Sequence, residues 1–318
     1  MQSGGANLDV PGVRSVPSLR YLNSGACFFD KDGTPTAGFD RDGRAASLLD
    51  QAERPFLAAH EMANGDASAI AAKLRAATCA DDFMKLFGDD TFDDADGALL
   101  RARFAIAVYE KSASELHPFD SKYDWFLKGN AKLAPAKLRG FALFNRKDKG
   151  NCAACHTDAR GSHGSPPLFT DYTCGNLGVP RNAQIPANAD PAYIDFGLCG
   201  ALRVPILRNV ATRQVFFHNG PFKTLRDAVH FCGHRNTHPE EFYPRDADGT
   251  LMKFADLPRD LQRNVNTGEV AYERRLGQAP RFDEAEIDDL IAFQESLTDG
   301  CDPATDTADS ARNVPAAL

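Results

Sequence analysis

The sequence predicts a mainly α-helical protein in which helices alternate with extensive irregular loops and little or no sheet. Apolar residues recur at helical spacing in several segments before residue 145 and again after residue 283. Residues 161–221 are instead dominated by Gly, Pro, Asn and Asp and contain no long periodic segment. Such a segment is expected to be irregular and to wrap around something large.

The helical pattern begins after a loop-like stretch. Residues 1 to about 40 are rich in Gly, Pro and Asp and predict little regular structure. Amphipathic helices are expected over residues 47–56, 67–77, 81–87 and 98–109. Gly88 follows the third of these and is suited to end it.

Residues that favour the first turn of a helix predict two further helix starts. Residues 117–129 form a polar and aromatic connector, after which Pro135 suits the first turn of a helix that reaches Asn145. Asp283 and Glu286 have capping-box spacing and predict a helix near the end of the chain.

Length and charge narrow the class of protein. A chain of 318 residues with 43% hydrophobic content is long enough for two domains. The net charge of −8 argues against nucleic-acid binding and favours weak attraction to a basic, soluble redox partner. No apolar stretch approaches the ~20 residues of a membrane-spanning helix. Residues 1–5 lack the basic and apolar regions of an export signal.

The segment Cys152-Ala153-Ala154-Cys155-His156 has the C-x-x-C-H spacing of a covalent c-type haem site. Its two thiols can form thioethers with the two vinyl groups of one porphyrin, and the adjacent imidazole can bind the iron. Half of a zinc site is an alternative, although it needs a fourth ligand and a cramped chelate by neighbouring residues. A thioredoxin-like redox pair is another, but it expects a βαβ setting that the sequence does not show.

Six cysteines lie outside this motif: Cys27, Cys79, Cys174, Cys199, Cys232 and Cys301. An even set is compatible with disulfides in an oxidising compartment, and Cys174 with Cys199 is the pairing that we expect. Covalent haem attachment is typical of a bacterial periplasmic protein. We therefore expect an export signal that was removed or that precedes this chain, and we favour a chain that begins late.

Several short motifs follow one another along residues 10–300. They are Arg14-Ser15-Val16-Pro17-Ser18-Leu19, Asp42-Gly43-Arg44, Gln51-Ala52, Glu61-Met62, the C-x-x-C-H segment, Asn176-Leu177-Gly178-Val179-Pro180, Val204-Pro205-Ile206-Leu207-Arg208-Asn209-Val210 and Phe217-His218-Asn219-Gly220. In this order they resemble the bacterial di-haem cytochrome c peroxidase and MauG family. The resemblance implies two cytochrome c-like domains, each with its own C-x-x-C-H motif.

On this resemblance, residues 1–128 are an incomplete peroxidatic domain without its haem motif, which would be expected shortly before Met1. Residues 129–301 are a second cytochrome c domain with the motif, and residues 302–318 are a flexible tail. In the family, peroxide reacts at the first haem and the second haem passes electrons to it. One covalent haem c is thus expected in this chain, and a second in the full family pattern.

The resemblance also assigns catalytic candidates. Gln51 and Glu61 match the distal-pocket glutamine and the acid that assists O–O cleavage. A surface helix position for Gln51, and a cap or salt bridge for Glu61, are the open alternatives. Arg41 stands where the family usually carries a tryptophan between the haems. Because Ser15, Arg213 and Val215 match the family's calcium ligands poorly, no calcium site is expected.

The group opposite His156 decides whether the iron transfers electrons or binds small molecules. Residues 225–233 align with the stretch that supplies this ligand, a methionine in the peroxidases and a tyrosine in MauG, and place Cys232 there. A bound thiolate would lower the reduction potential relative to methionine. Open alternatives are a disulfide or apolar role for Cys232, and ligation by one of its neighbours His230, His234 and His238.

Two residues of the motifs complete the predicted site. Arg208 is expected beside a haem propionate or, alternatively, in a surface salt bridge. His218 is expected to be a hydrogen-bonded structural histidine.

The combined prediction is a periplasmic c-type cytochrome of this family. We expect electron transfer through the haem held by His156, coupled to reduction of hydrogen peroxide or to peroxide-driven oxidation of a protein substrate. A single-haem electron-transfer or small-molecule-sensing module without peroxidase activity is the alternative.

Overall fold

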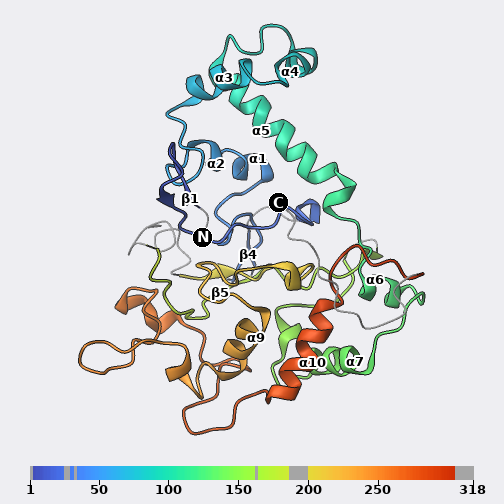
Figure 1. Ribbon diagram of the computed structural model, residues 1–318, viewed down its shortest axis with the longest axis vertical. Coiled ribbons are helices and arrows are strands. Elements are labelled where there is room, and N and C mark those ends of the chain that lie inside the picture. The colour runs from blue at the N-terminus through green and yellow to red at the C-terminus, as the bar shows by residue number, and fades with distance from the viewer. Residues whose placement is uncertain (1–2, 25–28, 32–33, 162–163, 186–199, 305–318) are drawn as a thin grey trace.

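The computed structural model describes residues 3–24, 29–31, 34–161, 164–185 and 200–304 (Figure 1). The chain is mainly helical with long irregular connections, which confirms the predicted fold class. Sheet in these ranges is limited to three two-stranded antiparallel ladders: β1 (Ser3–Gly4) with β2 (Val10–Pro11), β3 (Phe29–Lys31) with β4 (Thr34–Thr36), and β5 (Cys174–Gly175) with β6 (Leu202–Arg203). A bridge between Thr36 and Thr173 joins the second ladder to the third.

The first predicted helix is divided in two. Residues 47–56 were expected to form one helix, but α1 (Leu48–Gln51) ends before α2 (Arg54–Leu57) begins. The reason is Pro55, the second residue of α2, which has no N–H to donate and therefore fits only the first turn of a new helix. Ser47 caps α1 by accepting a hydrogen bond from the Asp50 amide at 3.1 Å.

Three longer helices follow and form the top of the molecule in Figure 1. They are α3 (Ala67–Arg75), α4 (Ala80–Phe87) and α5 (Ala95–Ser112). Gly88 ends α4 with φ 102°, as its position in the sequence predicted. Ala71, Ala80, Phe92 and Ala98 bury a small core between them. From there α5, which is longer at both ends than predicted, descends towards the middle of the molecule (Figure 1).

The larger core lies around α6 (Lys122–Leu127), α7 (Pro135–Asn145) and α10 (Glu284–Glu295). Pro135 and the Asp283–Glu286 capping box start α7 and α10 as predicted. The predicted connector instead contains α6, which begins at a second capping box formed by Ser121 and Asp124. That S-x-x-D spacing was visible in the sequence and marked a helix start.

Aromatic side chains fill this core. Tyr123, Phe144, Phe169 and Phe293 are at most 2% exposed, and their rings meet edge to face with centroids 5.3–6.0 Å apart. This core contains Tyr123, which precedes the predicted domain boundary at residues 128–129, together with residues that follow the boundary. The boundary stays a prediction. Because Phe169 lies in this core, the loop that follows the C-x-x-C-H motif is anchored on α6, α7 and α10.

Gly140→Ala should lower the free energy of unfolding by about 1–3 kcal/mol. A Cβ at position 140 would press on the Asp289 carbonyl oxygen and on Phe293, because α7 and α10 approach closely here. This strain should outweigh the ~1 kcal/mol that alanine gains in helix propensity. Urea unfolding measures the change, and Gly65→Ala, where an added Cβ has open space, is the control. Equal stability of the two variants would contradict the close approach.

Of the remaining elements, α9 (Leu225–His234) lies in the lower part of the molecule in Figure 1. Its first turn is capped by Thr224. Short 3-10 helices are η1 (Leu22–Ser24), η2 (Ser114–Leu116), η3 (Cys152–Ala154), η5 (Val210–Thr212), η6 (Pro239–Glu241) and η7 (Arg259–Asn264). In the described ranges, no helix combines the length and the apolar character needed to cross a membrane.

Candidate functional site

The C-x-x-C-H segment forms a compact turn directly after α7. Asn151 has a left-handed conformation with φ 50°, and its amide bonds to the Arg146 carbonyl at 3.1 Å. Cys152 begins η3, and its carbonyl accepts a hydrogen bond from the His156 amide at 2.8 Å. The local backbone therefore gathers Cys152, Cys155 and His156 on one turn, as covalent attachment of one tetrapyrrole requires.

The imidazole of His156 is oriented by a hydrogen bond from its Nδ1 atom. Nδ1 lies 2.9 Å from the carbonyl oxygen of the buried Phe169, so Nδ1 carries the proton and Nε2 carries the lone pair. Burial lowers the pKa of His156, so the ring is neutral at neutral pH. A neutral imidazole with one nitrogen donating to a carbonyl is the usual form of a histidine ligand.

The two thiols are in an apolar environment. Burial raises the pKa of Cys152 to about 12 and that of Cys155 to about 11. Cys152 packs against the larger core. Within the described residues, the donor atoms of Cys152, Cys155 and His156 do not converge with a further His, Cys, Asp or Glu. This arrangement disfavours the zinc alternative, which needs four converging ligands.

Cys232 on α9 lies close to Tyr272, a residue that the sequence analysis missed. The Tyr272 hydroxyl donates to Cys232 Sγ at 3.6 Å, and the guanidinium carbon of Arg235 lies 4.4 Å from the centre of the Tyr272 ring. Burial raises the pKa of both Cys232 and Tyr272, and Arg235 opposes the rise. Cys152 is near enough for its charge to raise the pKa of Tyr272 further.

Tyr272 was hard to find from the sequence because it lies in a loop without periodicity, directly after Ala271 with φ 76°. One chemical signal was available: the family resemblance names tyrosine as an alternative distal ligand. The structure thus brings two candidate ligands, Cys232 and Tyr272, close to Cys152, which the sequence predicts to attach haem. Both candidates bind iron as anions, and the buried cation of Arg235 favours the anionic form of either.

Arg41, Arg203 and Arg213 form a group of neighbouring arginines. Arg41 donates to the carbonyls of Ser15 at 3.2 Å and Val16 at 3.1 Å, and Arg213 donates to Val16 at 2.7 Å. Arg203 donates to the Gly38 carbonyl at 2.7 Å. None of these three arginines forms an ion pair with a described residue. Burial and the neighbouring Arg213, Arg203 and Arg14 lower the pKa of Arg41 to about 9.

These guanidinium groups fit the carboxylates of a tetrapyrrole. Arg203 is two residues before Pro205, whose backbone is close enough to His156 to raise the pKa of its imidazole. A buried guanidinium such as that of Arg203, close in sequence to a neighbour of His156, favours an anionic group beside the C-x-x-C-H turn. The residues present therefore fit haem: two thiols, an oriented imidazole, anionic ligand candidates and a cationic group for the propionates. Arg41 and Arg213 were noticed as departures from the family, but their proximity was not foreseen.

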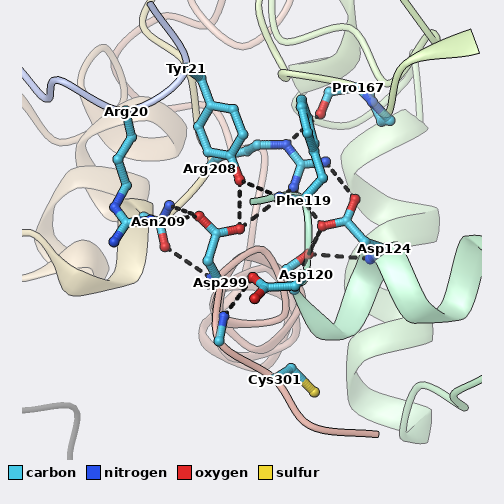
Figure 2. Close-up of polar contacts among 12 residues, drawn as sticks. Arg20, Tyr21, Phe119, Asp120, Asp124, Pro167, Arg208, Asn209, Asp299 and Cys301 are labelled. Atoms are coloured by element: carbon cyan, nitrogen blue, oxygen red, sulfur yellow. Dashed lines mark hydrogen bonds and ion pairs between the residues drawn. The ribbon is translucent and has the colours of Figure 1, made fainter. Parts of the chain in front are cut away.

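Arg208 is one half of a buried ion pair, which Figure 2 shows. Its Nη1 and Nη2 donate to the two carboxylate oxygens of Asp124 at 2.7 and 2.8 Å, and its Nε donates to the Pro167 carbonyl at 2.9 Å. Burial alone would raise the pKa of Asp124, but Arg208 and the hydrogen bonds from Ser121 together more than offset this effect, so the pKa is lowered. All three guanidinium nitrogens are thus engaged inside the protein, whereas a surface salt bridge or a propionate contact was expected. The propionate contact stays a prediction.

The same network ties distant segments to the pair. The Tyr21 hydroxyl donates to Asp299 at 2.6 Å, and the Asn209 amide nitrogen donates to the same carboxylate at 2.5 Å (Figure 2). The Arg208 guanidinium also lies 5.2 Å from the centre of the Tyr21 ring. Arg208 therefore joins the segment that follows β6 to Asp124 of α6 and to the Pro167 carbonyl.

Gln51 and Glu61 lie in the upper part of the fold, away from the C-x-x-C-H turn. Gln51 is the last residue of α1 and is half-buried, while Glu61 is exposed in a turn after α2. Neither side chain forms a hydrogen bond or ion pair with a described residue. The charge of Glu61 contributes to a raised pKa at Asp40, which is chiefly due to burial of Asp40. Their catalytic roles stay predictions.

The other predicted side chains have clear partners. His218 Nε2 lies 2.8 Å from an Asp256 carboxylate oxygen, and His218 is 3% exposed, as expected of a structural histidine. Cys79, Cys174 and Cys232 form no disulfide with another described cysteine. Cys27 and Cys199 lie outside the described residues, so the pairing of Cys174 with Cys199 stays a prediction.

Comparison with known proteins identifies relatives along nearly the whole chain. The family model for di-haem cytochrome c peroxidase matches residues 6–132. The chain is 32% identical to the methylamine utilization protein MauG of Paracoccus denitrificans over 311 residues, which cover 91% of this chain and 75% of that protein. It is 30% identical to the cytochrome c551 peroxidase of Nitrosomonas europaea over 198 residues, which cover 60% of this chain and 53% of that protein.

Solved structures agree with the sequence matches. The diheme peroxidase BthA from Burkholderia thailandensis superposes with a TM-score of 0.84 at 36% identity, covering 93% of this chain and 74% of that chain. Two independent comparisons, of sequence and of structure, therefore lead to one group of proteins. The chain belongs to the di-haem cytochrome c peroxidase and MauG family.

Proposed function

We propose that this chain is a periplasmic c-type cytochrome that couples electron transfer to the reaction of hydrogen peroxide. The observation that carries the proposal is the C-x-x-C-H turn itself. His156 has its Nδ1 engaged by the Phe169 carbonyl, so that Nε2 would bind the iron, and the two cysteines lie on the same turn. Each thioether would form by addition of an S–H bond across a vinyl C=C bond, which needs no oxidant.

The haem, when bound, would supply a redox-active iron that exchanges single electrons. His156 would hold it from one side, and the carbonyl of Phe169 keeps that imidazole in the correct tautomer. Arg41, Arg203 and Arg213 would bind the propionate carboxylates. Gln51 and Glu61 keep their proposed roles at a peroxide-reactive haem, where Glu61 would move a proton during O–O cleavage.

We propose Tyr272 as the distal ligand and Cys232 as its hydrogen-bonding neighbour. Arg235 is 1% exposed and its guanidinium carbon lies 4.4 Å from the centre of the Tyr272 ring, so its charge favours a phenolate. A tyrosine ligand also agrees with the MauG branch of the family, in which tyrosine replaces methionine. An anionic ligand stabilises the oxidised iron and lowers its reduction potential. This favours peroxide-driven oxidation of a protein substrate over simple peroxide reduction with a soluble redox partner.

The attachment site is tested by haem content. Protein made with an export signal and the cytochrome c maturation machinery should contain one haem c bound through Cys152 and Cys155, measured per chain as a pyridine haemochrome. The Cys152→Ala, Cys155→Ala double variant should contain none, while Cys79→Ala, an exposed cysteine, should keep full content. Full haem content in the double variant would overturn the proposal.

The single C-x-x-C-H motif of these 318 residues favours a second candidate, a single-haem electron-transfer module. Peroxide turnover separates the two. Reduction of one hydrogen peroxide to two waters consumes two electrons and two protons, so a peroxidase should oxidise a reduced donor protein in a 2:1 ratio to peroxide. A haem-loaded chain that exchanges electrons with the donor but leaves peroxide unchanged would support the second candidate.

A further inference from the structure

Two histidines lie one turn apart on α9, outside the site described above. His230 and His234 are four residues apart, the spacing at which two imidazoles project from one face of a helix and can bind a single ion. Their rings are parallel, with centroids 4.0 Å apart. Glu284, the first residue of α10, adds a carboxylate, and the donor atoms of the three side chains lie within 4.8 Å of one another.

The hydrogen bonds of both rings leave one nitrogen of each without a proton. Nε2 of His230 lies 2.8 Å from a Glu241 carboxylate oxygen, and Nδ1 of His234 lies 3.2 Å from the His230 carbonyl oxygen. A proton on each of these nitrogens leaves a lone pair on His230 Nδ1 and on His234 Nε2. A carboxylate or carbonyl that holds the outer nitrogen of a histidine is the arrangement that orients histidine ligands in metal sites.

The spacing between donor atoms also fits a metal ion. His230 Nδ1 lies 3.4 Å from Glu284 Oε1. Two ligands at ~2.0–2.1 Å from a tetrahedral zinc ion are separated by roughly 3.3–3.4 Å, so a cation can lie between them without a large movement. The other Glu284 oxygen accepts a hydrogen bond from Arg226 at 2.7 Å, which orients the carboxylate and leaves Oε1 for the ion. The charge of Arg226 opposes a bound cation and should keep the affinity moderate.

This group faces away from the candidate haem ligands. Cys232 lies between the two histidines in sequence, and two residues correspond to a rotation of roughly 200° around a helix. Cys232 therefore points to the opposite side of α9 from His230 and His234. Of the histidines named as alternative distal ligands, His230 instead contacts Glu241 and Glu284.

We propose that His230, His234 and Glu284 form a binding site for a borderline divalent cation such as Zn²⁺, with Glu241 as the residue that orients His230. Two imidazoles and one carboxylate are a donor set that suits zinc, with water in the fourth position. The ion would join the C-terminal half of α9 to the start of α10. The site does not depend on the proposed function, because none of its residues holds the haem.

The test is zinc binding to the haem-loaded chain, measured by isothermal titration calorimetry and by zinc content after dialysis. Wild-type protein should bind one Zn²⁺ per chain at this site, and its melting temperature should rise when Zn²⁺ replaces EDTA. His234→Asn and Glu284→Gln should abolish the rise. Glu241→Gln should weaken zinc binding about 10–100-fold, as loss of an orienting carboxylate does in known metal sites.

Matched variants make the result decisive. His60→Asn, a histidine in the upper half of the fold, should bind zinc as wild type does. In EDTA, the His234→Asn variant should keep the haem content and melting temperature of the wild type, which shows that it folds. Absence of zinc binding by the wild type would overturn the proposal. So would equal zinc affinity and stoichiometry in the wild type and a His230→Asn, His234→Asn double variant.

Discussion

Asp124→Asn should lower the free energy of unfolding by about 3–5 kcal/mol, because it removes the carboxylate that binds the buried guanidinium of Arg208 through two hydrogen bonds. Only the more distant Asp299 carboxylate, 4.0 Å from Arg208 Nη1, would remain as a counter-charge. The side chains of Asp124 and Arg208 are both fully buried, and two hydrogen bonds of 2.7 and 2.8 Å join them. Asparagine keeps the shape of the side chain but removes its charge and one acceptor oxygen. Urea unfolding of the haem-loaded protein, followed by circular dichroism, measures the change.

Asp148→Asn is the matched control. Asp148 also pairs with an arginine, Arg146, but its side chain is 69% exposed, so its loss should change the free energy of unfolding by less than ~1 kcal/mol. If the two variants lose equal stability, the buried pair is not the anchor that its geometry indicates. Asp124→Leu combined with Arg208→Met should recover part of the loss, because it removes both charges together.

The pair also predicts a pH dependence. The pKa of Asp124 is lowered in the folded protein, so its contribution to stability is present above the unfolded pKa of ~3.9. This contribution is lost as the pH falls below that value and through the folded pKa. Between pH 6 and 2, the wild type should therefore lose more stability than Asp124→Asn, whose side chain does not titrate.

Tyr272→Phe should raise the reduction potential of the bound haem by at least ~60 mV, the shift that corresponds to a tenfold change in the equilibrium constant of a one-electron couple. Loss of a phenolate ligand removes a negative charge that stabilises the oxidised iron. The potential is measured by spectroelectrochemical titration, and the absorption spectrum of the ferric protein should change with it.

Cys232→Ala separates the two ligand candidates. If Tyr272 is the ligand, this variant removes a hydrogen-bond acceptor at 3.6 Å and should shift the potential by less than ~60 mV. The opposite pattern, a large shift in Cys232→Ala and a small one in Tyr272→Phe, would establish the thiolate that the sequence predicted. Cys174→Ala, a thiol on β5, controls for loss of a half-buried cysteine.

Features that depend on neighbouring residues could be predicted from the sequence. Pro135 and the Asp283–Glu286 box start helices because their effects act within one turn, and the C-x-x-C-H motif is a single turn of chain. The same local rules, read more closely, would have found α6 at Ser121. The family could also be predicted, because several short motifs in a fixed order along the chain are together specific for it.

The partners of the site residues were decided by the tertiary structure. Asp124 meets Arg208 across 84 residues, and Tyr272 meets Cys232 across 40, so no periodic pattern connects either pair. Arg41, Arg203 and Arg213 come from separate segments that only the folded chain brings together. The sequence by itself determined where helices start and where haem is expected to attach. The tertiary structure decided which charges are buried together, because burial depends on the path of the whole chain.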